Sequence, residues 1–159
     1  MRFLLWTGDW EMTENAGASG EAEIRALIEE RAEAIRAKDV EAVLSVYAPD
    51  VLSFDLIDPL RHSGRDAIRT RLEAWLGQFR EGPIGFEMRD VEITVGGDAA
   101  FCHGLNRVDA TTKGGQTIDM WWRATSCFHR IQGRWMVTHE HSSVPFDMES
   151  GRASLGLKP

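Results

Sequence analysis

The chain has 159 residues, a formal net charge of −7, 43% hydrophobic residues and 27% charged residues. These values indicate one globular domain and exclude a mainly disordered chain. The acidic balance, with no run of Lys or Arg longer than two, argues against nucleic acid and anionic membranes as partners. Small molecules or other proteins remain as possible partners. Cys102 and Cys127 are expected to be reduced thiols of the core, and we expect no metal and no cofactor.

Residues 1–19 are expected to form a flexible arm, because the stretch ENAGASG near their end has a flexible composition. The apolar run FLLW close to the start is too short for a secretion signal or a membrane span. We therefore expect a cytoplasmic protein. The arm could also reflect an upstream start, with Met12 as the alternative first residue.

Three helices are predicted in the first half of the chain. The first begins at Glu21, with Ser19 available as its N-cap and Arg31 on its apolar stripe. The second begins at Asp39, whose side chain can cap it, and ends at Pro49. The third covers residues 62–79 and follows a short strand at residues 51–57. The side chains predicted to face inward are Ile24, Leu27, Ile28, Ile35, Val40, Val43, Leu44, Tyr47, Ile68, Leu72, Trp75, Leu76 and Phe79.

The second half of the chain is predicted to be a meander of antiparallel strands. Apolar and polar residues alternate after EGPIG, and the segments GGD, KGGQ and QGR are typical of turns between strands. Helices first and strands afterwards indicate the α+β class. We expect a cone-shaped, strongly bent antiparallel sheet with three N-terminal helices on its concave face. Residues 147–159 are Gly-rich and are expected to form a tail on the surface.

This order of elements resembles the nuclear transport factor 2-like superfamily, and within it the SnoaL-like and ketosteroid isomerase-like proteins. The most specific segments are the corner AKDVEAVLSVYAPDV and the hairpin QGRWMVTHEHSS. The resemblance covers residues 20–146 and implies a cystatin-like fold with a cavity. It does not by itself imply one activity, because this fold hosts isomerases, dehydratases, cyclases, hydrolases and non-catalytic assembly domains.

The resemblance places a general base at Asp55, nine residues before Gly64 of the SG pair. A carboxylate in an apolar cavity can remove a proton next to a carbonyl group. The isomerases also supply a Tyr on the first helix and a protonated Asp on a later strand. This chain has Arg31 at the first position and Ser126, or Thr125, at the second. We therefore do not expect a true steroid isomerase.

Alignment with the isomerase strand predicts that Phe101, His103, Leu105 and Arg107 face the cavity. His103 could then form an acid–base pair with Asp55, or it could be a histidine of the core hydrogen-bonded to a neighbour. The next strand is predicted to contribute Met120, Trp122 and Ser126 to the same cavity.

Two further features could bind a ligand. Trp121, Trp122 and Arg123 could pack in the core and in a dimer interface, or they could form a stacking wall, with Arg123 or Arg107 holding a ligand carboxylate. In the segment HEH, the alternation of the strand predicts that Glu140 and Ser142 face the cavity and that His139 and His141 face outward. The outer face is expected to support a homodimer, and a metal site at the two histidines is not expected.

Two functions therefore remain open. In the first, a homodimeric domain binds a small hydrophobic or carboxylate-bearing molecule and acts as a cofactor-free isomerase or dehydratase, with Asp55 as base. In the second, the same fold is a ligand-binding or assembly module without turnover. The residue that Asp55 contacts distinguishes these two functions. A pair with His103 in an open pocket favours catalysis, and a bidentate pair with Arg31 favours the module.

Overall fold

The computed structural model of the chain describes residues 8–159, and side-chain positions from residue 17 onward. In this part the chain forms helices α1 (Gly8–Ala37), α2 (Val40–Ser45) and α3 (Arg65–Gly77). The strands are β1 (Tyr47–Phe54), β2 (His62–Ser63), β3 (Gly85–Gly96), β4 (Ala99–Thr111), β5 (Thr117–Ile131) and β6 (Arg134–Ser143). No helix of the described residues is both long and apolar enough to cross a membrane.

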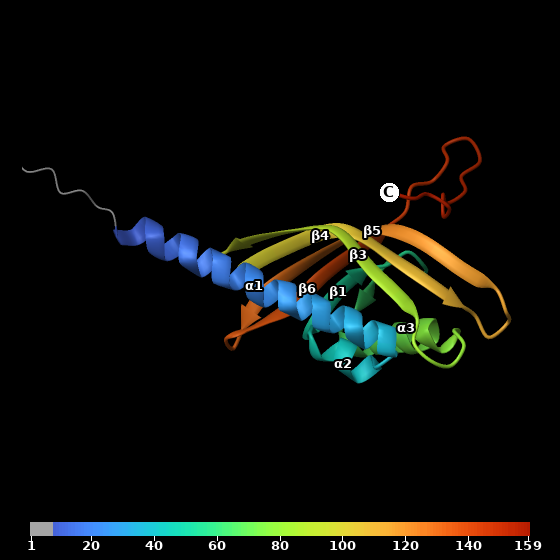
Figure 1. The fold of residues 1–159 in the computed structure, drawn as a ribbon, viewed down its shortest axis with the longest axis horizontal. Helices are drawn as coiled ribbons and strands as arrows, with labels where there is room; N and C mark the ends of the chain where they lie inside the picture. Colours follow the sequence, from blue (N-terminus) through green and yellow to red (C-terminus); the bar gives the residue numbers. More distant parts are fainter. Residues whose placement is uncertain (1–7) are drawn as a thin grey trace, which may run out of the picture.

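The strands form one open sheet in the order β2-β1-β6-β5-β4-β3. The meander β3–β6 is antiparallel, as predicted, and β1 joins its edge by pairing parallel with β6. The long strands bend over the helices, and α1 runs across the sheet (Figure 1). The α+β class and the cystatin-like arrangement are therefore confirmed.

The ends of all three helices differ from the prediction; the third, predicted over residues 62–79, covers Arg65–Gly77, and His62 and Ser63 form β2. Helix α1 begins at Gly8, so residues 8–19, expected as a flexible arm, continue the helix; residues 1–7 lie outside the described part. Ser19 is consequently not an N-cap, and its hydroxyl lies 3.4 Å from a carboxylate oxygen of Glu23. The predicted cap at Asp39 is confirmed, because its carboxylate accepts a 3.0 Å hydrogen bond from the Ala42 amide. Helix α2 ends at Ser45, and Tyr47 opens β1 instead of closing the helix.

The core lies between the helices and the concave face of the sheet. Helix α1 contributes Ile24, Ile28 and Ile35, all nearly inaccessible to solvent, as its stripe predicted. Helix α3 contributes the predicted Ile68, Leu72 and Leu76, and they pack in one cluster with residues of every long strand. Burial of this stripe fixes which face of each helix meets the sheet, and so it also fixes where Arg31 and Arg71 point.

Candidate functional site

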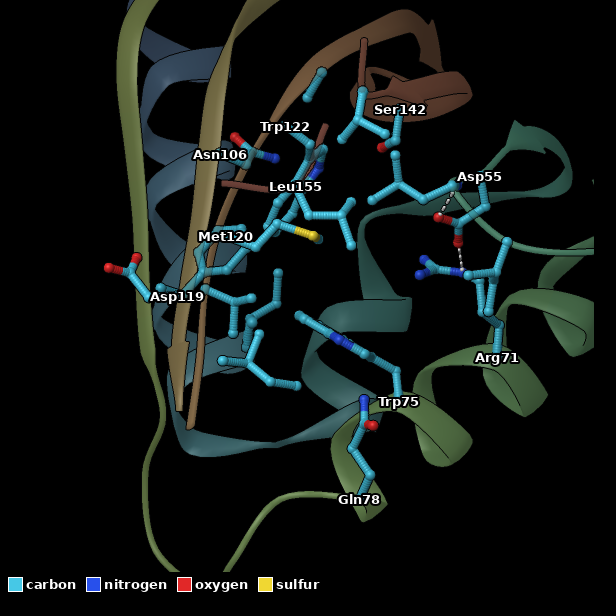
Figure 2. A pocket seen from close by; sticks show the side chains of 18 of the residues that line it. Asp55, Arg71, Trp75, Gln78, Asn106, Asp119, Met120, Trp122, Ser142 and Leu155 are labelled. Atoms are coloured by element: carbon cyan, nitrogen blue, oxygen red, sulfur yellow. Dashed lines mark hydrogen bonds and ion pairs between the residues drawn. The ribbon is translucent and has the colours of Figure 1, made fainter. Parts of the chain in front are cut away.

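A cavity of about 590 Å³ opens between the helices and the sheet. Most of its wall is apolar, and Figure 2 shows side chains from α3, β5 and the loop after β1 converging on it. Asp55 and Arg71 lie on one side of it and Met120 and Trp122 on another (Figure 2). Its apolar and aromatic lining residues are Ile35, Leu56, Ile57, Trp75, Phe79, Phe86, Val108, Ile118, Met120, Trp122, Ala124, Val144, Ala153 and Leu155.

Asp55 pairs with an arginine that was not predicted for the site. Asp55 follows the last residue of β1, and its carboxylate oxygen Oδ2 lies 2.8 Å from Nε of Arg71, which is on α3. The other oxygen, Oδ1, accepts a 2.6 Å hydrogen bond from the amide of Leu56. Both side chains are largely buried, at 12% and 13% exposure. The carboxylate is therefore held in one orientation at the wall of the cavity.

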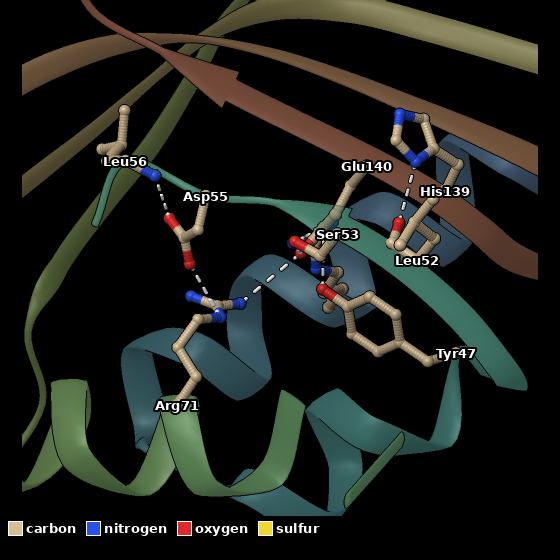
Figure 3. A network of polar contacts seen from close by, with 9 residues as sticks. Tyr47, Leu52, Ser53, Asp55, Leu56, Arg71, His139 and Glu140 are labelled. Atoms are coloured by element: carbon tan, nitrogen blue, oxygen red, sulfur yellow. Dashed lines mark hydrogen bonds and ion pairs between the residues drawn. The ribbon is translucent and has the colours of Figure 1, made fainter. Parts of the chain in front are cut away.

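Glu140 on β6 is the centre of a buried polar network (Figure 3). Its oxygen Oε2 accepts 2.9 Å hydrogen bonds from Arg31 and from the Tyr47 hydroxyl. The oxygen Oε1 lies 3.3 Å from the Ser53 hydroxyl and 3.5 Å from Nη2 of Arg71. One arginine thus bridges Asp55 and Glu140, and a second arginine neutralises Glu140 from α1.

The protonation of this network follows from burial and from its charges. Burial alone would raise the pKa of Glu140, but Arg31 and Arg71, together with hydrogen bonds from Tyr47 and Ser53, hold that pKa below its ordinary value. Burial raises the pKa of Tyr47 well above its ordinary value, so the phenol stays neutral. Burial would lower the pKa of Arg31, but the ionised Glu140, by its charge and its hydrogen bond, raises it, so the guanidinium stays charged. Glu140 is therefore an ionised acceptor at neutral pH.

The predicted pair between Asp55 and His103 is wrong. His103 on β4 lies on the other face of the sheet, its side chain is 51% exposed, and its Nε2 lies 3.6 Å from Glu92. Residues directly opposite on antiparallel strands share a face. Cys102, the neighbour of His103, is buried and lies opposite the cavity residue Ser126, and Asn106 lies opposite Trp122, which also lines the cavity; His103 therefore points to the other face. The alignment of β4 was therefore shifted by one residue, which turns every side chain to the opposite face.

The same shift removes Phe101 and Arg107 from the cavity, and Arg123 on β5, a third predicted ligand-binding residue, lies outside it as well. Phe101 is 44% exposed and stacks on His103. Arg107 contacts Asp119, Glu87 and Asp109, and its guanidinium lies 5.8 Å from the Trp121 ring centroid. Arg123 lies opposite Leu105 and is exposed. None of Phe101, Arg107 and Arg123 lines the cavity.

Other predicted positions face the cavity. Arg31, Asp55, Trp122, Ser126 and Glu140 all line it, and Ser142 lines it with them. Binding of a ligand by these residues stays a prediction. His139 is held elsewhere, because its Nδ1 lies 2.9 Å from the carbonyl oxygen of Leu52.

The two histidines of HEH pack against an aromatic side chain. The Phe54 ring packs edge-on against both His139 and His141. Among the described residues, no group of three His, Cys, Asp or Glu side chains is arranged to hold a metal ion. The structural evidence for these two histidines is therefore packing and hydrogen bonding on the outer side of the sheet.

Three polar partners of Glu140 in its network were not predicted: Arg71, and the hydroxyl groups of Tyr47 and Ser53. The signal for Arg71 was present in the helical period, since it lies three residues after Ile68 and four before Trp75, both on the predicted inner stripe. Arg31 was noticed for the same reason. Tyr47 was assigned to the inner face of a helix, and only its place at the start of β1 brings its hydroxyl to Glu140.

The model of the SnoaL-like domain matches residues 24–147. The chain belongs to the SnoaL-like domain family. An NTF2-like protein of unknown function from Pseudomonas putida KT2440 is 37% identical, with a TM-score of 0.80 over 89% of this chain and 98% of that chain. This SnoaL-like chain matches no curated protein significantly.

More distant structures share the fold with this SnoaL-like domain. A ketosteroid isomerase-like protein from Erwinia carotovora atroseptica is 18% identical, with a TM-score of 0.66 over 77% of this chain and 93% of that chain. A protein from Streptomyces avermitilis, provisionally described as a dehydratase of the NTF2-like family, is 18% identical, with a TM-score of 0.70 over 80% of this chain and 97% of that chain. At these identities the likeness concerns the fold alone.

Proposed function

We propose that this SnoaL-like domain binds a small, mostly apolar molecule in the cavity and that Asp55 acts on it as a general base, in a cofactor-free isomerisation or dehydration. One observation carries the proposal: an oriented carboxylate stands at the wall of an open apolar cavity, 2.8 Å from an arginine. The neighbours with isomerase-like and dehydratase descriptions are compatible with such chemistry.

The pair of Asp55 and Arg71 offers both groups that proton abstraction needs. A carboxylate lone pair takes the proton from the carbon next to a carbonyl group, and negative charge then develops on the carbonyl oxygen. Arg71 contacts Asp55 through Nε and Glu140 through Nη2. Its Nη1 makes no hydrogen bond within the described residues, and Figure 2 shows the guanidinium directed toward the cavity. Nη1 is therefore available to stabilise the enolate oxygen.

The charges of the cavity favour an uncharged ligand over a carboxylate. The charged lining residues are Arg31, Arg71, Asp55, Asp119 and Glu140. Both arginines already face carboxylates within the protein, so a ligand carboxylate would exchange its hydration for a hydrogen bond from Nη1 of Arg71, whose positive charge is already compensated. The indole N–H groups of Trp75 and Trp122, which have no hydrogen bond within the described residues, can donate to a neutral carbonyl or hydroxyl group.

A binding module without turnover is the second candidate. It is favoured by the contacts of Asp55, whose two oxygens already meet Arg71 and the Leu56 amide. A carboxylate held in this way can serve as a fixed polar wall of a binding site without accepting a proton. The two functions share the cavity and differ in whether Asp55 exchanges a proton with the bound molecule.

Proton exchange from a neutral ketone separates the two functions. We would incubate the protein with 2-acetylnaphthalene in deuterated water and follow the methyl signal by proton NMR. A base at Asp55 accelerates loss of the signal, Asp55→Asn abolishes the acceleration, and Asp58→Asn, in the exposed part of the same loop, retains it. Binding by calorimetry without exchange would support the module, and the absence of binding would contradict both functions.

We propose further that two copies pair through the outer face of the sheet. This face carries the partly exposed Phe54 and Phe101 together with His103 and His141. Aromatic residues are common at protein interfaces, and a face shared by two identical chains gives a symmetric dimer.

A further inference from the structure

We infer that the C-terminal segment, residues 145–159, forms a wall of the cavity and that Leu155 contacts the bound molecule. The contact between Leu155 and a ligand rests on the proposed function. The wall itself rests on the fold of the segment. The segment was expected to be a surface tail. Its residues are indeed mostly exposed, but Ala153 and Leu155 also line the cavity together with residues of β5 and β6.

The segment is a folded turn with its own hydrogen bonds. The amide of Asp147 donates to the carbonyl of Arg152, and the amide of Ser154 donates to the carbonyl of Pro145, both at 2.8 Å. Phe146 and Ala153 pair as an isolated antiparallel bridge. The Asp147 carboxylate also accepts hydrogen bonds from the amide and the hydroxyl of Ser150, at 2.8 Å and 2.7 Å. These bonds return the chain toward the sheet after β6 ends.

The turn places Leu155 at the cavity. Figure 2 shows its side chain beside Trp122 and Met120 of β5. It is 50% exposed, so one side of it contacts the protein and the other remains available. An exposed Leu over an apolar cavity gains further burial when an apolar molecule binds beneath it. Leu155 therefore acts in binding and selection of the ligand, and no step of proton transfer is assigned to it.

A second contact holds the end of the segment. Lys158 forms an ion pair with Asp119 at the edge of β5, and Asp119 also contacts Arg107 at 2.7 Å. The Lys158 and Asp119 side chains are 51% and 35% exposed. An exposed ion pair of this kind is worth at most about fivefold in an equilibrium constant. The hydrogen bonds of the turn and the contact of Leu155 therefore contribute most to holding the segment in place. The ion pair adds a smaller contribution that depends on salt.

Two leucines of the segment provide a matched test. Leu155 and Leu157 are 50% and 54% exposed, and only Leu155 lines the cavity. The probe is the neutral dye N-phenyl-1-naphthylamine, whose fluorescence rises in apolar sites. Leu155→Ala is expected to weaken its affinity by about fivefold, because about half of an apolar side chain is lost from the wall. Leu157→Ala is expected to leave the affinity unchanged. Equal effects of the two substitutions would overturn the inference.

A measurement without any ligand tests the wall by itself. In the free protein, hydrogen exchange at the amides of Asp147, Gly151 and Ser154, all hydrogen-bonded within the turn, is expected to be slower than in an unfolded chain. Exchange at the unfolded rate would overturn the inference, whatever the dye does. Slow exchange without dye binding to the parent protein would leave the wall in place, refute the ligand contact of Leu155 and count against the proposed binding of neutral molecules.

Discussion

Glu140 Oε1 lies 3.5 Å from Nη2 of Arg71, so a buried carboxylate of β6 holds the arginine that in turn holds Asp55. The base that is proposed to act in the cavity is thus positioned from two directions. Strand β1 places Asp55 directly after Phe54, and the network of Glu140 holds the guanidinium of Arg71 beside Asp55. Glu140 is a positioning residue for Asp55, acting through Arg71.

Glu140→Gln is expected to destabilise the protein. The substitution removes the negative charge that compensates two buried guanidinium groups, and breaking a buried ion pair from one side costs about 3–5 kcal/mol. Urea unfolding followed by circular dichroism measures the loss. Glu92→Gln is the control, because the Glu92 side chain is 80% exposed and its carboxylate lies 3.6 Å from His103, far from the network. Equal unfolding free energies for Glu140→Gln and the parent would show that the network contributes nothing to stability.

The contribution of Glu140 to stability is expected to disappear in acid. Its pKa is lowered in the folded protein, below an unfolded value of about 4.3. The folded state then binds fewer protons than the unfolded state, so the contribution is present above about pH 4.3 and is lost as the pH falls through the folded pKa. Urea unfolding at a series of pH values measures the free energy of unfolding of the parent and of Glu140→Gln. The difference between these two free energies should become smaller below about pH 4. A difference that widened in acid would contradict the lowered pKa.

An uncharged ligand is expected to bind better than its carboxylate analogue. Calorimetry at pH 7 with 2-acetylnaphthalene and 2-naphthoate compares molecules of similar shape, and the ketone should bind at least tenfold more tightly, because each arginine of the cavity is already paired. Trp122→Phe removes an indole donor that faces the cavity and should weaken binding of the ketone. Trp121→Phe, at the neighbouring position that pairs with Arg107 on the outer face, should not. Tighter binding of the naphthoate would refute the charge argument.

Phe101→Glu is expected to separate the proposed dimer into monomers. It places a charge on an outer face that is proposed to be buried between two copies, and an unpaired charge in an apolar interface is costly. Light scattering coupled to size-exclusion chromatography measures the mass. Leu60→Glu serves as the control, since Leu60 is 95% exposed in the loop before β2. A parent protein that runs as a monomer at micromolar concentration would refute the dimer.

Much of the fold was predictable because local patterns carry it. The stripe of Ile24, Ile28 and Ile35, the cap at Asp39 and the turns at GGD, KGGQ and QGR each depend on residues a few positions apart. The alternation around Glu140 likewise predicted correctly which side of β6 faces the cavity. For the same reason Arg71 could have been found from its spacing to Ile68 and Trp75.

The remainder of the site depends on registers that no local pattern specifies. His103 and Asn106 belong to one strand of mixed polarity, and only the pairing of Asn106 with Trp122 decides which of them faces the cavity. The placement of Tyr47 in β1 and the return of Leu155 to the cavity depend in the same way on contacts between distant segments. The sequence by itself determined the α+β class, the inward stripes of the helices and the position of Asp55. Tertiary structure decided the partner of Asp55, because strand register and helix packing together choose which of several charged side chains share one buried space.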